Sequence, residues 1–404
     1  MNPPEPYVVR AARWLAFGSA VAIMFSIAVS QIMLALAVAA LLASGLPLRL
    51  PRIKWPLALF MLGTLASLAF SGDIASGLPQ VRKFYVFLEL LVVYSSLRNL
   101  KVLRWLFLTW VGFGALTAMR GFVQFADKMR QAHALGQSMY SYYVGERITG
   151  FTSHWNTYSA EEMFAFVMAC AFLLFAPRGR RSWVWLLCAA CEALAVLLSD
   201  TRGVWLATLA AALYLIWNWK RKLVALVPAA VLLACFLSPA AIHERFASIL
   251  RPSEIDSNQF RLVVWRTGLE MIRKHPLLGL GPEGVGKHFQ EYVPASVPRP
   301  LPTGWYGHLH NIYLHYAAER GIPTMMFLLW MLIQMLVDFS RGLRRIPHGR
   351  SLRRFLLYGA VAVVLGAMVE GCVELNLGDS EVLTMFLVAA AAGYVALDRD
   401  VTEA

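Results

Sequence analysis

Three histidines stand close together where the chain enters a long apolar stretch. The segment Trp305–His315 contains His308, His310 and His315, with Asn311 beside the second histidine. A neutral imidazole can accept a proton, and nearby cations favour its neutral form. A zinc site is the weaker interpretation, because there is no H-E-x-x-H pattern or neighbouring cysteine, and the carboxylates are badly placed. We therefore expect a general base here, although an interfacial polar position would explain His308 or His315 taken alone.

A second group of candidates consists of cations at the ends of apolar segments. Arg82, Arg202 and Arg320 each lie at or just inside such an end. An ionisable side chain at membrane depth is costly and is therefore a functional-site candidate, with snorkelling to lipid phosphates as the alternative. The loops on the same predicted side supply further candidates, namely Arg147, Arg261 and Arg266. Several cations on one side favour an anionic ligand.

The turn Asp200-Thr201-Arg202-Gly203 separates two apolar stretches. An arginine fork at a tight turn can grip a phosphate through two hydrogen bonds, whereas the simpler interpretation pairs Asp200 with Arg202. A separate acidic patch is expected further along the chain, formed by Glu370, Glu374, Asp379 and Glu381. That patch could receive sugar hydroxyls or balance nearby arginines.

Two other patterns are weaker. Gly279, Gly281 and Gly284 spell G-x-G-x-x-G, but this pattern binds dinucleotides only between a strand and a helix, and here two prolines interrupt it. We expect a glycine turn that directs Lys287 or backbone amides toward the membrane surface. The five cysteines lie in or beside apolar segments, and the C-x-x-C of Cys188 and Cys191 fits helix packing better than redox or metal chemistry.

Composition defines the elements that must position these residues. The 404 residues are 58% hydrophobic and 15% charged, with a mean hydropathy of +0.57 and a formal net charge of +13. These values exclude a water-soluble globule and predict an all-α, polytopic membrane protein. In a membrane protein, an excess of positive charge usually marks the cytoplasmic loops. We therefore expect membrane lipids rather than nucleic acid as partners. About twelve windows could cross a membrane: 12–27, 29–45, 55–71, 80–97, 104–125, 155–176, 182–199, 203–219, 223–238, 309–338, 354–371 and 381–397.

The distribution of basic residues among the connecting segments predicts how these spans are oriented. If residues 12–46 form a hairpin that breaks near Ser30, every strongly basic connection falls on one side, which the positive-inside rule identifies as cytoplasmic. Both termini then face the cytoplasm, and the first apolar run is a span rather than a removable signal peptide. The histidine segment lies on the opposite, outer side.

Two outer segments are too long for simple turns, 127–154 and 239–308. We therefore divide the chain into residues 1–238, with nine spans and the smaller loop; residues 239–308, a large loop subdomain; and residues 309–404, with three spans that begin at the histidine segment. Residues 257–274 have helical periodicity, and a proline-rich stretch follows them.

Three segments together resemble the O-antigen ligase and polymerase superfamily, most closely its ligases. The first is His310-Asn311 followed at the family's spacing by Gly321 and Thr324, and the second is Thr201-Arg202-Gly203. The third runs from Phe260-Arg261 through Trp265 to the stretch His275–Gly281. The order of an Arg-Gly turn, a large loop and His-Asn on a span is more specific than any single motif.

The resemblance implies a GT-C-like membrane glycosyltransferase in the bacterial inner membrane, with its site facing the periplasm. Such an enzyme would be inverting and metal-independent, moving a glycan from undecaprenyl pyrophosphate to the lipid A-core oligosaccharide without cofactor or ATP. His310 would be the base and Asn311 its orienting or sugar-binding neighbour. Arginines would hold the pyrophosphate, and the substrate-binding candidates are Arg82, Arg147, Arg202, Arg261, Arg266 and His308.

Three alternatives remain open from the sequence. An O-antigen polymerase or a protein O-oligosaccharyltransferase could use the same donor and a similar base, but with a growing glycan or a Ser/Thr side chain as acceptor. A lipid-linked-oligosaccharide flippase would instead need charges deep in many spans and near both leaflets. The predicted spans look largely free of charge, and the candidate cations lie on one side, which disfavours transport.

Overall fold

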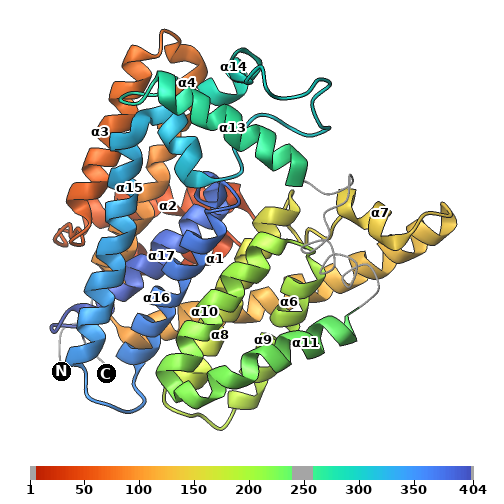
Figure 1. The fold of residues 1–404 in the computed structure, drawn as a ribbon. Helices are drawn as coiled ribbons and strands as arrows, with labels where there is room; N and C mark the ends of the chain where they lie inside the picture. The colour runs from red at the N-terminus through yellow and green to blue at the C-terminus, as the bar shows by residue number, and fades with distance from the viewer. Residues whose placement is uncertain (1–5, 239–257, 402–404) are drawn as a thin grey trace, which may run out of the picture.

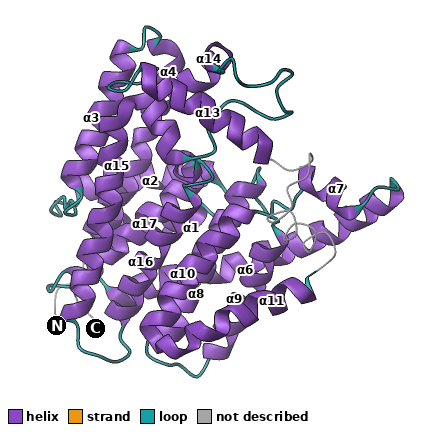
Figure 2. Cartoon of the chain, in the orientation of Figure 1, coloured by secondary structure: helices purple, strands orange, loops and turns teal. Residues whose placement is uncertain are grey.

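A computed structural model describes residues 6–238 and 258–401, and every regular element among them is a helix (Figures 1 and 2). Five of these helices are long and apolar enough to cross a membrane, which fits the expected polytopic membrane protein. They are α6 (Leu100–Ala134), α8 (Trp155–Phe175), α15 (Ile312–Arg345), α16 (Leu352–Glu370) and α17 (Ser380–Leu397). The total of about twelve crossings remains a prediction.

The remaining helices cover most of the other predicted windows. They are α1 (Tyr7–Ala22), α2 (Ile27–Ala43), α3 (Lys54–Phe70), α4 (Ile74–Arg82), η1 (Lys83–Phe87), α5 (Leu88–Ser96), α7 (Met139–Gly145), α9 (Ser182–Leu198), α10 (Arg202–Lys220), η2 (Arg221–Leu226), α11 (Val227–Leu237), α13 (Asn258–Lys274), α14 (Gly284–Tyr292) and η3 (Asn376–Gly378). The window 80–97 is therefore not one helix, because it begins at the end of α4 and then passes through the tighter η1 into α5.

The predicted hairpin at the N-terminal end is present, but its break lies at Ile23–Ser26 rather than at Ser30. The hydroxyl of Ser26 accepts a hydrogen bond from the amide of Val29 and so caps α2. Across the hairpin, the Ser30 hydroxyl donates to the Ser19 carbonyl at 2.9 Å. These polar contacts inside the apolar pair fix α1 against α2.

The boundaries of the two outer loops differ from the prediction. Helix α6 continues to Ala134 and α7 occupies Met139–Gly145, so the segment 127–154 is largely helical. In the second loop, the structure contains the expected helix as α13, and a shorter helix, α14, follows it. Residues 239–257 of this loop lie outside the described part of the chain.

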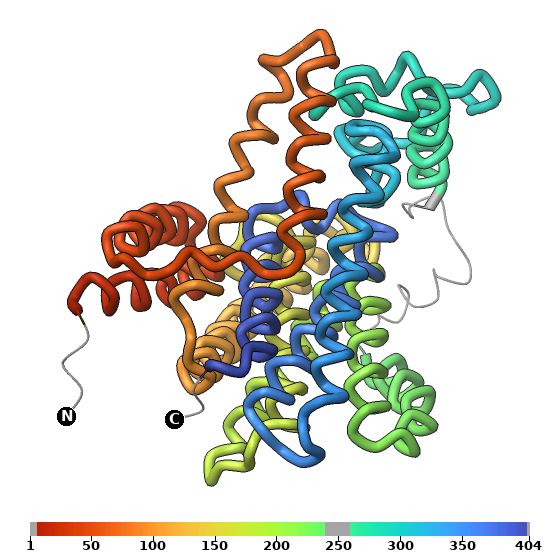
Figure 3. The backbone as a smooth tube through the Cα atoms, turned by 90° about the vertical axis from the view of Figure 1, so that its left-hand side faces the viewer, coloured from red at the N-terminus to blue at the C-terminus, as the bar shows by residue number. Residues whose placement is uncertain are grey.

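Helices α15 and α16 lie side by side and connect the two ends of the molecule (Figures 1 and 3). Helix α16 is buried along most of its length between α8, α10 and α17. Gly321 interrupts α15 with a φ of 82°, a left-handed value that glycine adopts without steric cost. The interruption separates a short outer turn of helix, next to the histidine segment, from the long span below it.

The glycine segment that resembles a nucleotide loop packs against this interruption. The amides of Leu280 and Gly281 donate to the carbonyls of Ala318 and Glu319 at 2.9 and 2.8 Å. A Cβ at Gly279 would collide with the backbone of Glu319. The glycines therefore permit backbone contact with α15. Lys287 forms an ion pair with Asp73, and its expected position near the membrane surface stays a prediction.

The helices of the predicted spans contain more buried ionisable side chains than the sequence suggested. Glu89 on α5, Glu161 and Glu162 on α8, and Glu192 on α9 are all buried, none more than 2% exposed. The Thr117 hydroxyl donates to the Glu162 carboxylate. The expectation that the spans are largely free of ionisable side chains is therefore wrong for these helices, and the candidate cation Arg320 also lies buried in α15.

Candidate functional site

The histidine segment ends in a sharp turn that presents His310. His310 has a φ of 44°, in the left-handed region where a non-glycine residue is strained and often functional. Asn311 follows as the N-cap of α15, because its side-chain oxygen accepts hydrogen bonds from the amides of Tyr313 and Leu314 at 3.0 and 2.9 Å. Its side-chain amide donates to the Cys372 carbonyl at 2.8 Å. Asn311 therefore fixes the turn that carries His310.

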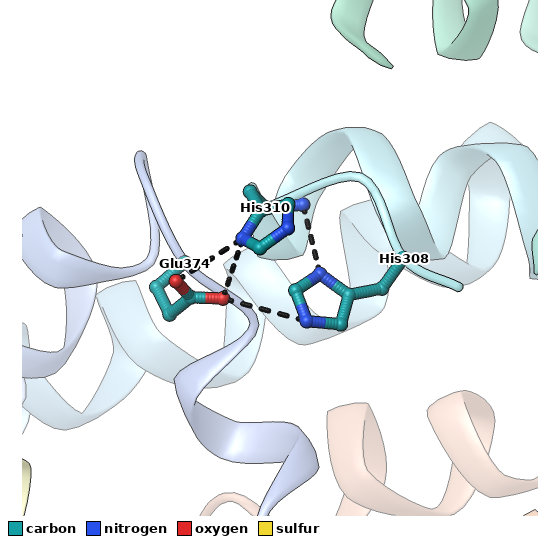
Figure 4. Close-up of side chains that lie close together, drawn as sticks. All are labelled: His308, His310 and Glu374. Carbon is teal, nitrogen blue, oxygen red and sulfur yellow. Dashed lines mark hydrogen bonds and ion pairs between the residues drawn. The ribbon is translucent and has the colours of Figure 1, made fainter. Parts of the chain in front are cut away.

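Glu374, on the loop after α16, is the carboxylate that organises the histidines (Figure 4). Its oxygens lie 3.1 and 3.2 Å from Nδ1 of His310, and Oε1 is 3.6 Å from Nε2 of His308. The side-chain amide of Asn156, at the start of α8, donates to Oε2 at 3.0 Å. Arg261 on α13 approaches the same oxygen at 4.0 Å. Three segments distant in sequence thus converge on one carboxylate.

The surroundings of Glu374 keep it ionised. Burial alone would raise its pKa, but the hydrogen bond from His310 and the nearby positive groups outweigh burial and lower the pKa to about 2. His308 shows the opposite effect. Burial, reinforced by repulsion from His310, lowers its pKa to about 3 and keeps this ring neutral near pH 7.

These contacts also define the tautomers. The backbone amide of His310 donates to Nδ1 of His308 at 3.1 Å, so neutral His308 carries its proton on Nε2. An ionised Glu374 can only accept, so neutral His310 carries its proton on Nδ1. This leaves the Nε2 lone pair of His310 available, and no residue in the described part of the chain hydrogen-bonds to that atom. A carboxylate that holds an imidazole in one tautomer is the arrangement needed for a general base.

His310 lines a cavity of about 1320 Å³ whose other walls carry arginines. Arg147, Arg202 and Arg261 all contribute to it, together with the proline-rich loop before Trp305. Arg147 Nε lies 3.6 Å from Asp200 Oδ2, and its guanidinium also stacks near the Trp155 ring. The cavity thus places a base beside three guanidinium groups, an arrangement suited to a phosphate-bearing ligand.

A second cavity, of about 480 Å³, lies on the other side of His308 and Glu374, and both residues line both cavities. Its walls are rich in carboxylates and amides. The Lys83 ammonium donates to the Gly378 carbonyl at 3.1 Å in this wall. The Thr157 hydroxyl donates to Asp379 at 2.8 Å, and burial raises the pKa of this carboxyl. Such donors and acceptors suit sugar hydroxyls better than phosphate.

The structure brings some of the predicted residues together and leaves others apart. Arg82 and Arg266 are exposed and line neither cavity, whereas Arg320 is buried and lines the smaller one. The Arg320 guanidinium lies over the Tyr316 ring and donates to the Thr64 hydroxyl at 3.3 Å.

The expected acidic patch is not separate from the base, because Glu374 belongs to both cavities and hydrogen-bonds with His310. The expectation that no carboxylate is placed for metal binding is also wrong. Donor atoms of His308, His310 and Glu374 all lie within 4.8 Å of one another, so these three side chains could hold a metal ion. Their hydrogen bonds suit an acid–base role equally well.

Sequence reasoning placed Glu374 only in the acidic patch and did not link it to His310, and it did not assign Asn156 or Lys83 to the site. No spacing signal links Glu374 to His310, since they are 64 positions apart and meet only because α15 packs against α16. The one available signal was an ionisable residue at the outer end of a predicted span.

The helical fold, its spans and this site define a polytopic membrane protein with a candidate acid–base centre. Residues 187–329 match the family model described as O-antigen ligase, and this match over part of the chain supports the resemblance to the O-antigen ligase and polymerase superfamily. The matched segment begins in α9 and ends in α15, so it includes Arg202, Arg261 and His310 but not Glu374. No curated protein matches the chain.

Proposed function

We propose that this protein is an O-antigen ligase of the bacterial inner membrane. In this proposal both termini face the cytoplasm and the His310 site faces the periplasm. The enzyme inverts the anomeric centre as it transfers a glycan from undecaprenyl pyrophosphate to the lipid A-core oligosaccharide, with neither metal nor ATP. The observation that carries the proposal is His310, held by Glu374, in a cavity that also contains Arg202 and Arg261.

The chemistry follows from the two cavities. The larger, arginine-lined cavity takes the pyrophosphate end of the donor, because guanidinium groups match phosphate oxygens in charge and geometry. The smaller cavity takes acceptor-sugar hydroxyls, which its carboxylates and amides can bind. His308 and Glu374 stand between the two, which places the reacting atoms near His310.

In the reaction, Nε2 of His310 takes the proton of an acceptor hydroxyl. The acceptor oxygen forms a bond to the anomeric carbon of the donor from the face opposite the pyrophosphate. The bond between that carbon and the pyrophosphate oxygen breaks, and its electron pair leaves with the pyrophosphate. Arg202 and Arg261 stabilise the developing negative charge. Glu374 stabilises the imidazolium, so it is a positioning residue rather than a reactant.

The decisive experiment is a metal-free reconstituted assay with purified undecaprenyl-pyrophosphate glycan. Lipid A-core, glycan and peptide acceptors are offered separately to the full-length protein. Labelled lipid A-core supports the ligase. Labelled glycan would identify a polymerase, and labelled peptide an O-oligosaccharyltransferase. Absence of transfer to every acceptor would contradict the enzyme and favour transport.

A further inference from the structure

A second arginine-lined cavity, of about 660 Å³, lies at the end of the molecule away from His310. It is formed by the C-terminal end of α15, the connection 346–351, the start of α16, the end of α17 and Arg52 before α3. In Figure 3 the connection 346–351 lies at the lower end of the molecule, whereas the start of α15 lies in its upper half. Six arginines line the cavity, namely Arg52, Arg341, Arg345, Arg350, Arg353 and Arg399.

Two of these arginines build the walls. The Arg353 guanidinium donates to the carbonyls of Ala396 and Val401 at 2.9 and 2.8 Å, and so closes the end of α17. Arg350 donates to the carbonyl of Ala176 at 2.9 Å and fixes the end of α8. Because these carbonyls have no helical partner, the arginines act as C-terminal caps.

The acidic groups in the cavity are already engaged. Asp338 is 4% exposed, and its two oxygens accept hydrogen bonds from Gln334 and from the Tyr394 hydroxyl at 3.1 and 3.0 Å. Arg52 lies 3.8 Å from the same carboxylate. Asp398 accepts from Arg98 at 2.5 Å. Neither carboxylate therefore neutralises the remaining cations.

Arg341, Arg345 and Arg399 remain. All three are exposed and line the cavity, and none forms a hydrogen bond or ion pair with a residue in the described ranges. Guanidinium groups held around one space repel one another, and a phosphate oxyanion can bridge them through bidentate hydrogen bonds. The positive-inside rule explains why connecting segments are basic, but it does not explain why their arginines surround a cavity.

We propose that this cavity binds the phosphate of an anionic phospholipid headgroup, with Arg341, Arg345 and Arg399 as its ligands. The cavity lies at the ends of α15, α16 and α17, three helices long and apolar enough to cross a membrane, and headgroup phosphates are concentrated where such helices leave the hydrocarbon layer. Its volume falls in the range of sites that enclose small ligands. The site is distinct from the donor and acceptor cavities and does not depend on the proposed ligase activity.

The test uses purified full-length protein in detergent and native mass spectrometry. Phosphatidylglycerol and phosphatidylcholine are titrated separately, and inorganic phosphate is added as a competitor. We expect selective binding of phosphatidylglycerol, with apparent affinity reduced about tenfold or more in the double variant Arg341→Gln/Arg345→Gln. The matched control is Arg180→Gln/Arg181→Gln, an equal loss of charge from the exposed loop between α8 and α9, which should change affinity less than about twofold.

An equal loss of phosphatidylglycerol affinity in the two double variants would mean that general surface charge explains the binding, and it would overturn the proposed site. No loss in either variant would overturn it as well. If inorganic phosphate displaces the lipid at matched concentration, and does so through the same arginines, a free anion rather than a headgroup is the ligand and the lipid assignment is wrong. Should the double variant fail to fold by its melting profile, Arg399→Gln tests the same cavity from α17.

Discussion

Arginine-lined cavities lie toward both ends of α15 and α16, and they use their cations differently. At the end that carries His310, Arg261 and two histidines converge on the buried carboxylate of Glu374. At the other end, Arg350 and Arg353 cap helices, while neighbouring guanidinium groups surround an open space. Both cavities contain several arginines, but only the cavity at His310 also contains a candidate general base. That difference distinguishes the proposed catalytic site from the proposed lipid-binding site.

The largest expected effect comes from removing the base. His310→Ala should lower ligation turnover by about 10²–10⁴-fold, because the acceptor hydroxyl then has no general base. Phosphatidylglycerol binding at the opposite end should stay unchanged. The measurement is initial rate in the reconstituted assay, with His288→Ala on α14 as the control, since His288 pairs with Glu291 one turn away and lines neither site cavity. Wild-type turnover by His310→Ala would show that His310 is not the base, and the two arginine-lined cavities would then no longer differ in this respect.

Glu374→Gln should come next, with a loss of about 10²-fold in turnover. A neutral amide neither stabilises an imidazolium nor requires the Nδ1-protonated tautomer of His310. If Glu374 acts through His310, the pH profile of turnover should shift as well as fall. Glu291→Gln, an exposed carboxylate outside both cavities, is the control. An unchanged pH profile with reduced rate would assign Glu374 a purely structural role.

Arg202→Lys should reduce kcat/KM by about tenfold, because an ammonium keeps the charge but loses the planar fork. Arg266→Lys is the matched control, since Arg266 is exposed and lines neither site cavity. Steady-state kinetics with varied donor concentration measure both variants. Wild-type kinetics for Arg202→Lys would leave Arg202 as a turn residue and weaken the assignment of the larger cavity to the pyrophosphate.

The smallest effect is on stability below neutral pH. The pKa of His308 is lowered from 6.5 to about 3, so below pH 6.5 the unfolded chain takes up a proton that the folded chain does not. Stability should therefore fall as the pH drops from about 6.5 toward 3, by at most about 1.4 kcal/mol per pH unit from this group. Melting temperatures of wild type and His308→Gln at pH 7.5 and 5 measure the effect. Parallel pH profiles would show that His308 does not make this contribution.

Much of the helical organisation was predictable because apolar run length and basic connections are local features. The windows for α3, α8, α9, α16 and α17 agree with the observed helices to within one or two residues. The end of α6 was not predictable in this way, because its last turns, near Lys128 and Ala134, are polar and amphipathic rather than apolar. The helical tail is joined to the following loop by the ion pair of Lys128 with Glu146 at 2.6 Å.

By itself, the sequence determined the class of fold, the candidate base at His310 and the resemblance to the O-antigen ligase family, since each depends on composition or on motifs a few residues long. Only the tertiary structure decided which cations share a cavity with that base, and it retained Arg147, Arg202 and Arg261 but left Arg82 and Arg266 outside. It also supplied Glu374 as the partner of His310. The physical reason is that helix packing brings together residues far apart in the chain, and the charge and tautomer of each group depend on those neighbours.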